Sequence, residues 1–522
     1  MKKTSHNYVI LFSILLAVFL GAVARFYPVL LSHYPINDGG LFYQMSQDIL
    51  DHNFALPFHT SYNSEDIPFG YPPIPFYLLA LIQRFLHIAL LDQLHYLPAL
   101  ISTLCIPAFY FLSRSITGSK ERSVFAVFAY ALIPGSYSWL IMGGGISRAL
   151  GILLAILSLC FVWEMFKNTK VSWLLLSIFS CSLLVLSHPG ITWFVFVTSL
   201  LISLQIGLNK KRILYAILTA LGILVLTSPW WIITLRRFGF SLFVDAVKSS
   251  GPINPSVILF NFTGEPFITI IAVVALLGLF AEIVRRRYFL LIWLILIAFV
   301  TPRGSLRLAA IPGSMLFASG VVWVIVPGLT SFTKRVSEDS QQLGEIMREG
   351  ISKVALAIIL FAAFFSALAF PLLGSPETKS LSQSDVQAMQ WVSQNTLLNS
   401  RFALLTGEEQ WITDPITEWF PAFAKRNSVA TIQGSEWLPD QTYKKRIDSY
   451  YALQDCSEQD YSCVATWAKD NNISYSYLYV TRPASGEKGI NLPINYSLVT
   501  SDELQLSFEN QGVRIYRVVD PP

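Results

Sequence analysis

The sequence predicts a polytopic α-helical membrane protein that continues into a mixed α/β domain. Of its 522 residues, 53% are hydrophobic and only 13% are charged, whereas soluble proteins carry about 25% charged residues. Apolar stretches of about 20 residues, the length that crosses a bilayer, recur as far as residue 371. Beyond that point short β-rich runs alternate with polar turns. We therefore expect a transmembrane domain over 1–371 and a soluble domain over 372–522.

The distribution of charge agrees with this division. Residues 372–522 hold 12 Lys and Arg against 18 Asp and Glu, and residues 1–371 hold the other 25 and 15. Such an asymmetry is expected when basic loops face the cytoplasm and an acidic tail lies outside. Those loops also explain the net charge of +4, so no nucleic-acid partner is expected.

The first apolar run exceeds the apolar region of a secretory signal, and no small-residue cleavage site follows it. We interpret it as a retained first helix. About eleven spans are predicted, with twelve or thirteen as alternatives. In chain order the eleven are 8–31, 96–113, 122–141, 148–166, 171–187, 190–208, 213–235, 265–284, 288–301, 305–329 and 352–371.

Basic residues flank alternate spans, which predicts a cytoplasmic N-terminus and an extracytoplasmic tail. One apolar segment, residues 73–91, would invert this alternation if it crossed the membrane. It follows several prolines and is interrupted by Arg84 and His87. We therefore expect an amphipathic helix on the outer membrane surface. Residues 32–95 then form an acidic first external loop with juxtamembrane helices.

Asp38 is the candidate catalytic residue of this loop. Residues 32–75 contain five carboxylates and no Lys or Arg, and Asp38 lies about one helical turn beyond the predicted membrane boundary. Gly39 and Gly40 free the backbone beside it, and an acid at the mouth of a membrane helix is costly and rarely without function. We expect a general base that takes a proton from an acceptor hydroxyl. The alternative is a plain turn residue.

Four basic side chains are external in this topology, although basic residues generally gather in cytoplasmic loops. They are Arg148, His188, Arg303 and Arg307. Cations above the outer leaflet beside an acidic loop suit a phosphate-bearing ligand, because Arg binds phosphate in a bidentate manner. Arg148 also follows three glycines whose N–H groups are able to bind an anion at a helix start. The structural alternatives are an interfacial anchor for Arg148 and a helix cap for His188.

Three further acids are candidates for an acceptor-binding or auxiliary role, namely Glu265 in NFTGEPF and Glu65 and Asp66 in the first loop. Glu65 and Asp66 are able to ligate a divalent metal together with Asp38, although their spacing specifies no metal. The sequence contains no Walker loop, HExxH motif, paired CxxC or nucleophile elbow. None of the chemistries that those motifs mark is therefore indicated.

The tail shows one clear helix and several short strands. SDVQAMQWVSQNT, residues 384–396, has a Ser-Asp start and helical apolar spacing. The runs RFALLTG, SVATI, SYSYLYV and VRIYRVV are typical of strands. Cys456 and Cys463 lie close together in the sequence, and we expect either a disulfide, if the tail is external, or two free thiols.

Several short motifs together resemble the GT-C superfamily of membrane glycosyltransferases. INDGGLFYQM follows the first helix, and the aromatic-Pro-Pro stretch GYPPIPFYLL leads into the surface helix. In this order they resemble protein O-mannosyltransferases, the aminoarabinose–lipid A transferase and the oligosaccharyltransferase catalytic subunit. The stretches GGGISRALG, LSHPGITW, RGSLRLAAIP and AMQWVSQNT resemble uncharacterised prokaryotic members. The architectural resemblance covers most of residues 1–371.

The chain departs from these relatives at two points. Tyr71 stands where relatives of the aminoarabinose transferase carry a Lys, and GGGISR fills the loop where many relatives carry a second acid. The second departure weakens the expectation of a metal-dependent mechanism. The tail motif WFP, residues 419–421, does not resemble the oligosaccharyltransferase WWD signature, and we assign it no role.

The resemblance implies transfer of a sugar from a polyprenyl-phosphate donor to an acceptor on the extracytoplasmic face of the cell membrane. Asp38 would match the catalytic aspartate of the first loop, and Arg303 or Arg307 the ligand of the donor phosphate. The acceptor, whether protein, lipid or glycan, stays open. The alternatives are a transporter or flippase of a lipid-linked saccharide and a non-catalytic membrane assembly protein.

Overall fold

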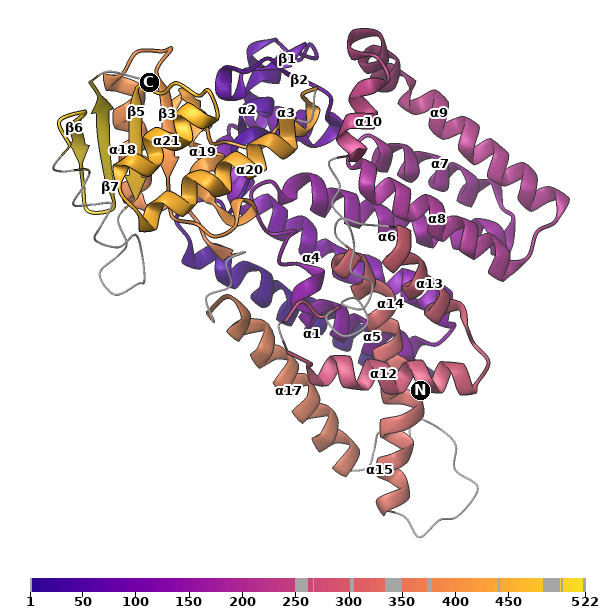
Figure 1. Cartoon of the computed structure of the whole chain (residues 1–522). Coiled ribbons are helices and arrows are strands. Elements are labelled where there is room, and N and C mark those ends of the chain that lie inside the picture. The colour runs from indigo at the N-terminus through magenta and orange to yellow at the C-terminus, as the bar shows by residue number, and fades with distance from the viewer. Residues whose placement is uncertain are drawn as a thin grey trace.

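The computed structural model describes residues 2–248, 262–265, 267–300, 305–333, 350–372, 378–439, 442–481, 498 and 501–519. Within these ranges the chain forms a helical part, residues 2–372, and a tail, residues 378–519. Figure 1 shows the tail, coloured orange to yellow, beside the first loop of the helical part.

The helical part contains two-residue strands β1 (His59–Thr60) and β2 (Ile67–Pro68), which pair antiparallel in the first loop. Its described helices are α1 (Lys2–Leu31), α2 (Gly40–Asp51), α3 (Ile74–Leu86), α4 (Leu90–Thr117), α5 (Lys120–Leu132), α6 (Gly145–Asn168), α7 (Val171–Val185), α8 (Pro189–Ile206), α9 (Lys210–Phe238), α10 (Ser241–Lys248), α12 (Ile270–Val284), α13 (Phe289–Val300), α14 (Ser305–Gly320), α15 (Val326–Thr333) and α17 (Gly350–Leu372).

The helices agree with a multi-pass membrane protein. Seven segments of the described residues are long and apolar enough to span a bilayer: Asn7–Leu31, Leu90–Thr117, Gly145–Asn168, Pro189–Ile206, Lys210–Phe238, Arg307–Leu329 and Lys353–Pro371. Each coincides with a predicted span. The predicted spans 171–187, 265–284 and 288–301 correspond to shorter apolar helices, so the total of eleven stays a prediction.

The predicted span 122–141 is helical only in its first part. Helix α5 ends at Leu132, and a 3-10 turn, Pro134–Ser136, follows it. Proline cannot donate the hydrogen bond that would continue the helix. The chain from Ile133 to Gly144 therefore runs as an irregular segment between α5 and α6, and this segment carries Trp139.

The segment 73–91 does not form one long helix. Helix α3 has 13 residues, about 20 Å in length, which is too short for a bilayer core of about 30 Å. It ends at Leu86, and the C-cap His87 has a left-handed φ of 56°. Leu90 then begins α4, six residues before the predicted span 96–113.

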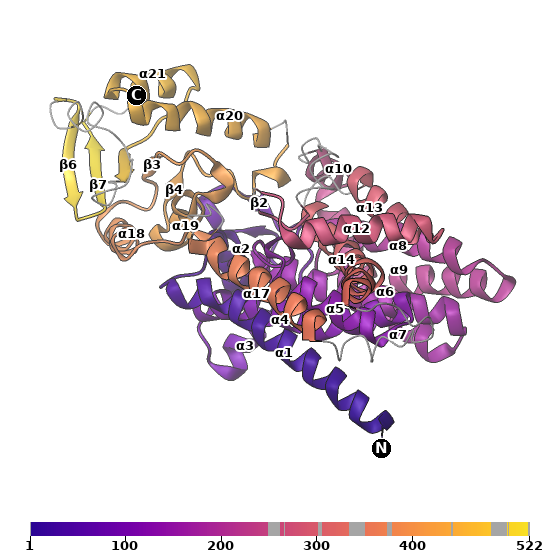
Figure 2. The same cartoon turned by 90° about the horizontal axis from the view of Figure 1, so that it is seen from below.

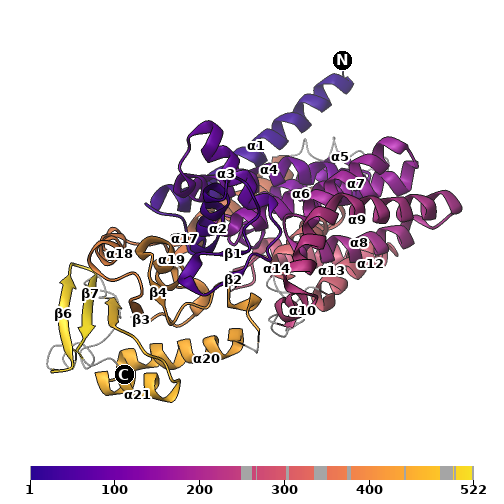
Figure 3. The same ribbon diagram turned by 90° about the horizontal axis from the view of Figure 1, so that it is seen from above.

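Close backbone contact joins α12 to α14. A Cβ atom on Gly278 would lie 1.8 Å from the Leu316 carbonyl oxygen, and one on Gly320 would lie 2.0 Å from the Val274 oxygen. Only glycine permits such an approach. At the periphery, apolar side chains such as Phe12 on α1 are exposed, as expected for lipid-facing positions. The start of α1 projects beyond the other helices (Figure 3).

The tail is a five-stranded mixed sheet between helices. Its strand order is β4-β3-β5-β7-β6, parallel between the first three strands and antiparallel for the rest. The elements are α18 (Gln383–Asn395), α19 (Pro415–Ala424), α20 (Thr442–Gln454), α21 (Tyr461–Asp470), β3 (Arg401–Leu405), β4 (Asn427–Ser428), β5 (Tyr477–Thr481), β6 (Leu504–Glu509) and β7 (Val513–Val518).

Alternation along the central strand explains the layers. Phe402 and Leu404 of β3 pack in the same core as α18 and α19, whereas Ala403 and Leu405 pack with α20 and α21, because successive strand residues point to opposite faces. Figure 2 shows the sheet between these two helix pairs. Cys456 forms a disulfide with Cys463.

Candidate active site

Asp38 lies in the turn between α1 and α2, and its carboxylate has two partners from the start of α6. The Gly144 N–H donates to Asp38 Oδ1 at 2.9 Å, and Arg148 Nη2 donates to Oδ2 at 2.7 Å. About a fifth of each of these two side chains is exposed, 22% for Asp38 and 17% for Arg148. The carboxylate is thus held in place by charge-assisted hydrogen bonds and remains reachable.

Glycine is required at this contact because two backbones meet. A Cβ on Gly143 would lie 2.2 Å from the Asp38 carbonyl oxygen, and one on Gly144 would lie 2.8 Å from the Asp38 Cγ. Gly39 adopts a φ of 134°, which side chains rarely allow. The predicted anion site at the glycines of GGGISR is thereby occupied by the carboxylate of Asp38 itself.

Arg148 and Arg307 both lie against Trp139. Their guanidinium carbons are 5.8 Å and 5.7 Å from the centre of the indole ring, within the range of cation–π attraction. Arg148 Nε also donates to the Trp139 carbonyl oxygen at 2.9 Å. The irregular segment after α5 thus brings an arginine of α6 and an arginine of α14 to the same place.

His188 joins this group as the N-cap of α8. Its Nδ1 accepts a hydrogen bond from the Ile191 N–H at 3.3 Å. Burial, with the positive charges of Arg307 and Arg148, lowers the pKa of His188 to about 3. The imidazole is therefore neutral near pH 7, with its proton on Nε2 because Nδ1 is an acceptor. The structure gives His188 the capping role that the sequence left as an alternative.

The tail holds the turn that carries Asp38. Asn37 donates its backbone N–H to the Lys379 oxygen at 2.7 Å, and its carbonyl oxygen accepts from the Trp419 indole N–H at 2.8 Å. Glu418 Oε1 accepts from the backbone N–H groups of Gly39 and Leu41, each at 3.2 Å. Two residues at the start of α2 are thus fixed by the tail helix α19.

Glu418 is a second acid close to Asp38. It is buried, and its Oε2 has no hydrogen-bond partner among the described residues. Burial, together with the negative charge of Asp38, raises the pKa of Glu418 to about 8. Glu418 is therefore mostly protonated near pH 7, which removes the repulsion that two adjacent carboxylates would otherwise exert.

Tyr62 and Asn63 extend the contact between the first loop and the tail. The Tyr62 hydroxyl donates to the Glu418 carbonyl oxygen at 2.5 Å. Asn63 exchanges two side-chain hydrogen bonds with the Ser428 backbone, at 2.7 and 2.9 Å. The tail and the first loop therefore form one continuous hydrogen-bonded structure.

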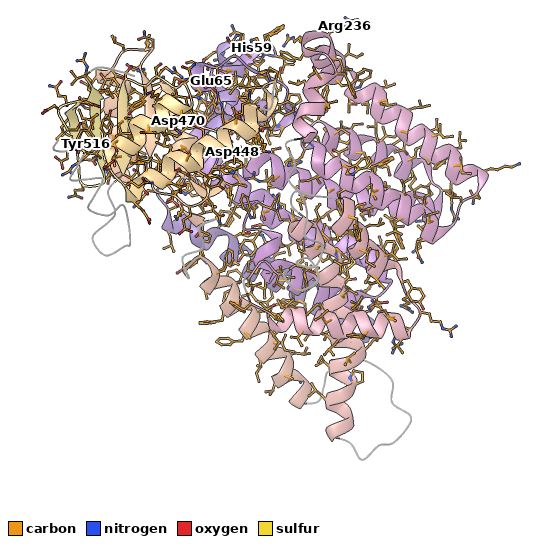
Figure 4. The ribbon with its side chains drawn as sticks, viewed as in Figure 1. His59, Glu65, Arg236, Asp448, Asp470 and Tyr516 are labelled. Atoms are coloured by element: carbon orange, nitrogen blue, oxygen red, sulfur yellow. A yellow bond between two sulfur atoms is a disulfide. The ribbon has the colours of Figure 1, made fainter. Side chains whose placement is uncertain are left out.

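The other predicted acids lie apart from this network. Glu65 pairs with Arg446 through two hydrogen bonds of 2.7 Å, at the junction of loop and tail where Figure 4 labels it. Asp66 is exposed and has a left-handed φ of 51°. Glu265 is buried, and its Oε1 accepts from Ser366 at 2.9 Å. Arg303 lies outside the described residues.

A metal centre is not assembled in the part of the chain that the structure describes, since no three His, Cys, Asp or Glu side chains gather there in a suitable cluster. The combination of Asp38, Glu65 and Asp66, which the sequence left open, is not brought together. Glu65 is bound to Arg446 instead, and Asp38 is bound to Arg148.

Glu418 and Trp419 are the residues of this site that the sequence did not reveal. The helix start was recognisable, because Asp414-Pro415 is a favoured N-cap and first position, and Asp414 accepts from the Ile416 and Thr417 N–H groups. The partner of that helix was not recognisable, since the Gly39–Glu418 contact joins residues 379 positions apart.

Comparison with known proteins shows a family likeness in the first half of the chain. The model of the family "Oligosaccharyl transferase STT3, N-terminal" matches residues 8–263. No protein of curated function matches the sequence.

Solved structures of two proteins share the fold. ArnT from Cupriavidus metallidurans in the apo state has a TM-score of 0.56 at 12% identity, over 98% of each chain. The same protein bound to undecaprenyl phosphate has a TM-score of 0.53 at 13% identity, over 97% of each chain. Arabinofuranosyltransferase AftD from Mycobacteria has a TM-score of 0.54 at 15% identity, over 97% of this chain. This chain spans only 40% of the AftD chain.

The family match over the first half of the chain includes α1, the Asp38 turn and Arg148. The shared fold extends this likeness through the remaining helices and the tail. The chain therefore resembles the STT3 family over residues 8–263 and shares its fold with ArnT and AftD. Both findings agree with the GT-C resemblance of the sequence motifs.

Proposed function

We propose that this protein transfers a sugar from a polyprenyl-phosphate donor to an acceptor hydroxyl on the extracytoplasmic side of the membrane. Residues 1–371 would form the membrane domain and residues 372–522 an extracytoplasmic domain. The observation that carries the proposal is the reachable Asp38 carboxylate, fixed by Gly144 and Arg148 beside the Trp139–Arg307 contact. The solved relative ArnT binds undecaprenyl phosphate, which supports this class of donor.

Asp38 would act as the general base. A base must be held in place and must be reachable by the proton it removes. The hydrogen bonds from Gly144 and Arg148 hold the carboxylate, and its exposed fraction leaves it accessible. Asp38 would take the proton of the acceptor hydroxyl as the acceptor oxygen forms a bond to the anomeric carbon of the sugar.

Arg307 and Arg148 would bind the phosphate of the donor. The bond between the anomeric carbon and the phosphate oxygen breaks, and the polyprenyl phosphate leaves with an added negative charge. Guanidinium groups placed before the reaction stabilise such charge as it develops. Direct attack by the acceptor, without a covalent intermediate, predicts inversion at the anomeric carbon. Arg303 remains a further candidate ligand of the phosphate.

His188 would contribute shape and one neutral donor rather than charge. Its Nδ1 caps α8, and its low pKa keeps the ring uncharged near pH 7. The Nε2 proton is then available to a phosphate or sugar oxygen. This assignment replaces a cationic role of His188 in phosphate binding with a neutral one.

The test is transfer of labelled sugar from a panel of polyprenyl-phosphate sugars in membranes that contain the protein, beside the variant Asp38→Asn. The variant keeps the side-chain volume but removes the base, so we expect transfer to fall by about 10²–10⁴-fold. The abundance of the two proteins in the membrane is matched by immunoblot. Retained transfer in Asp38→Asn would refute the role of Asp38.

The same experiment addresses the alternatives. A transporter or flippase would move a lipid-linked saccharide without consuming it, and an assembly protein would neither bind nor consume it. Consumption of one donor in the panel, with the release of polyprenyl phosphate, supports the transferase. Movement of intact donor across vesicle membranes, with no released polyprenyl phosphate, would contradict it.

A further inference from the structure

A second group of arginines surrounds an indole ring at the end of the membrane helices opposite Asp38. Helix α14 begins near Trp139, which Arg307 contacts, and reaches its other end at Gly320. Its 16 residues span about 24 Å. Helix α5 runs the other way, from Arg122 to the segment that carries Trp139. The two ends of these helices therefore define two separate sites.

The group at the far end is built around Trp323. The guanidinium carbons of Arg122, Arg285 and Arg287 lie 4.0, 4.5 and 5.1 Å from the centre of its ring. These three arginines come from α5 and from the turn after α12. We call Arg122, Arg285, Arg287 and Trp323 the Trp323 cluster.

Charge in the Trp323 cluster is only partly balanced within the described structure. Glu282 Oε1 accepts from Arg122 Nη2 at 2.6 Å, and both side chains are buried. Arg285 and Arg287 are exposed, and none of the ion pairs found among the described residues involves them. The Arg122 Nε is buried and has no acceptor among those residues. Among the described residues, only the Arg122 guanidinium of the three is paired with a carboxylate.

The backbone places the ring where these arginines meet. Trp323 lies in a π-helical turn, Val321–Ile325, between α14 and α15. A π turn inserts an extra residue into a helix, changes the direction of its side chains, and is frequent at functional sites. The close glycine contact between α12 and α14 at Gly278 and Gly320 lies directly before it.

We infer that the Trp323 cluster binds the phosphate-bearing headgroup of an anionic phospholipid at the membrane surface opposite the Asp38 site. A phosphodiester accepts hydrogen bonds from guanidinium groups in a bidentate manner. Exposed arginines at the ends of apolar helices lie at headgroup depth, and basic pockets between membrane helices bind anionic headgroups. Because this site is at the other membrane surface, its ligand is distinct from the sugar donor.

The experiment measures the stabilisation of the purified full-length protein in detergent by added lipid. Phosphatidylglycerol, phosphatidylcholine and inorganic phosphate are each titrated, and the apparent affinity is obtained from the shift in Tm. The test variant is Arg285→Gln with Arg287→Gln. The matched control is Lys210→Gln with Lys211→Gln, which removes the same charge from exposed positions at the start of α9.

Lys210 and Lys211 are a matched pair because they face the same membrane surface. Helix α8 begins directly after its N-cap His188, beside the Asp38 site, and ends at Ile206 on the opposite side, shortly before α9 begins at Lys210. A general effect of positive charge would therefore weaken lipid binding equally in both double variants. A specific site predicts loss only when Arg285 and Arg287 are replaced.

We expect phosphatidylglycerol to raise the Tm of the wild type and of the Lys control, and phosphatidylcholine to have little effect. The Arg variant should bind phosphatidylglycerol at least about tenfold more weakly. The loss of one hydrogen bond to a charged group lowers the affinity by a factor of about ten. Arg285→Gln alone should give a smaller loss in the same direction.

Three results would overturn the inference. Equal phosphatidylglycerol affinity of the Arg variant and the wild type would exclude the Trp323 cluster as the site. Equal loss in the Lys control would reduce the effect to general surface charge. Stabilisation by inorganic phosphate without stabilisation by phosphatidylglycerol would identify a soluble anion in place of a lipid.

Discussion

The two ends of the membrane helices both bring arginine to tryptophan, but they treat the neighbouring carboxylate differently. At the Trp139 end, the Asp38–Arg148 pair keeps exposed fractions of 22% and 17%. At the Trp323 end, the side chains of the Glu282–Arg122 pair are only 4% and 6% exposed. A reachable pair is able to exchange its partner for a substrate, whereas a buried pair is committed to the fold. The ion pair at the Trp139 end is therefore open to a ligand, and the ion pair at the Trp323 end stabilises the fold.

Replacement of Arg122 should have the largest effect on stability. Arg122→Gln leaves Glu282 buried without its cation, and breaking such a pair costs about 3–5 kcal/mol. We expect a large fall in the Tm of the purified protein. Arg148→Gln, at the reachable pair, should lower Tm far less, and we expect it to impair transfer. Similar losses of Tm in the two variants would contradict the distinction between the two ends.

Gly144→Ala tests the close contact at the Asp38 end. The added methyl group would lie 2.8 Å from the Asp38 Cγ and would displace the carboxylate. A displacement of about 1 Å at a reacting group lowers the rate by about 100-fold. We therefore expect the rate of sugar transfer to fall by about 100-fold. Gly328→Ala on α15 is the control, because a methyl group there meets nothing within 4 Å. Full transfer by Gly144→Ala would show that the carboxylate tolerates movement.

Glu418 should make the attachment of the tail depend on pH. Its pKa is raised from the ordinary value to about 8, so the folded protein binds a proton that the unfolded chain loses near pH 4.5. This contribution to stability is present at low pH and is lost as the pH rises toward and through 8. We expect Tm, or resistance of the tail to proteolysis, to fall over that interval.

The variant Glu418→Gln isolates this effect. Glutamine stays uncharged at every pH and is able to accept the same two backbone hydrogen bonds. We expect a flatter dependence of Tm on pH between 5 and 9 than in the wild type. An unchanged slope would mean that groups other than Glu418 govern it.

A smaller effect on stability is expected where the ion pair Glu65–Arg446 joins the first loop to the tail. Arg446→Gln removes the partner of Glu65, which is partly buried, and the loss of such a charged hydrogen bond costs about 1.5–3 kcal/mol. Arg514→Gln is the matched control in the same domain, since the Arg514–Glu509 pair is more exposed and should contribute about 1 kcal/mol or less. Equal changes in the Tm of the two variants would show that Arg446 does not hold the tail to the loop.

Much of the helical part was predictable because lipid imposes a simple pattern. Each of the seven long candidate spans coincides with an apolar run in the sequence, since a chain in lipid must satisfy its own backbone hydrogen bonds over the full thickness. The end of α5 at Leu132 was missed because residues 133–141 carry no charged side chain. Their burial serves the protein interior and not a span.

The site was predictable where topology alone brings residues together. Arg148 and Arg307 were candidates because the predicted topology makes them external, against the positive-inside trend, and the structure brings both to Trp139. The tail residues were not predictable, because Glu418 and Trp419 lie in an ordinary amphipathic helix whose partner is some 380 residues away. Glu65 was a candidate for an acceptor-binding or metal-binding role, but it forms an ion pair with Arg446 of the tail. That partner was not recognisable from the sequence for the same reason.

The central claim is that Asp38 performs the chemistry while arginines hold the donor phosphate. The direct test measures two quantities on the same purified variants: binding of undecaprenyl phosphate and transfer of the sugar from its donor. Asp38→Asn should bind undecaprenyl phosphate as the wild type does and transfer almost nothing. Arg307→Gln should bind it at least about tenfold more weakly. Loss of binding in Asp38→Asn with normal binding in Arg307→Gln would contradict this division of roles.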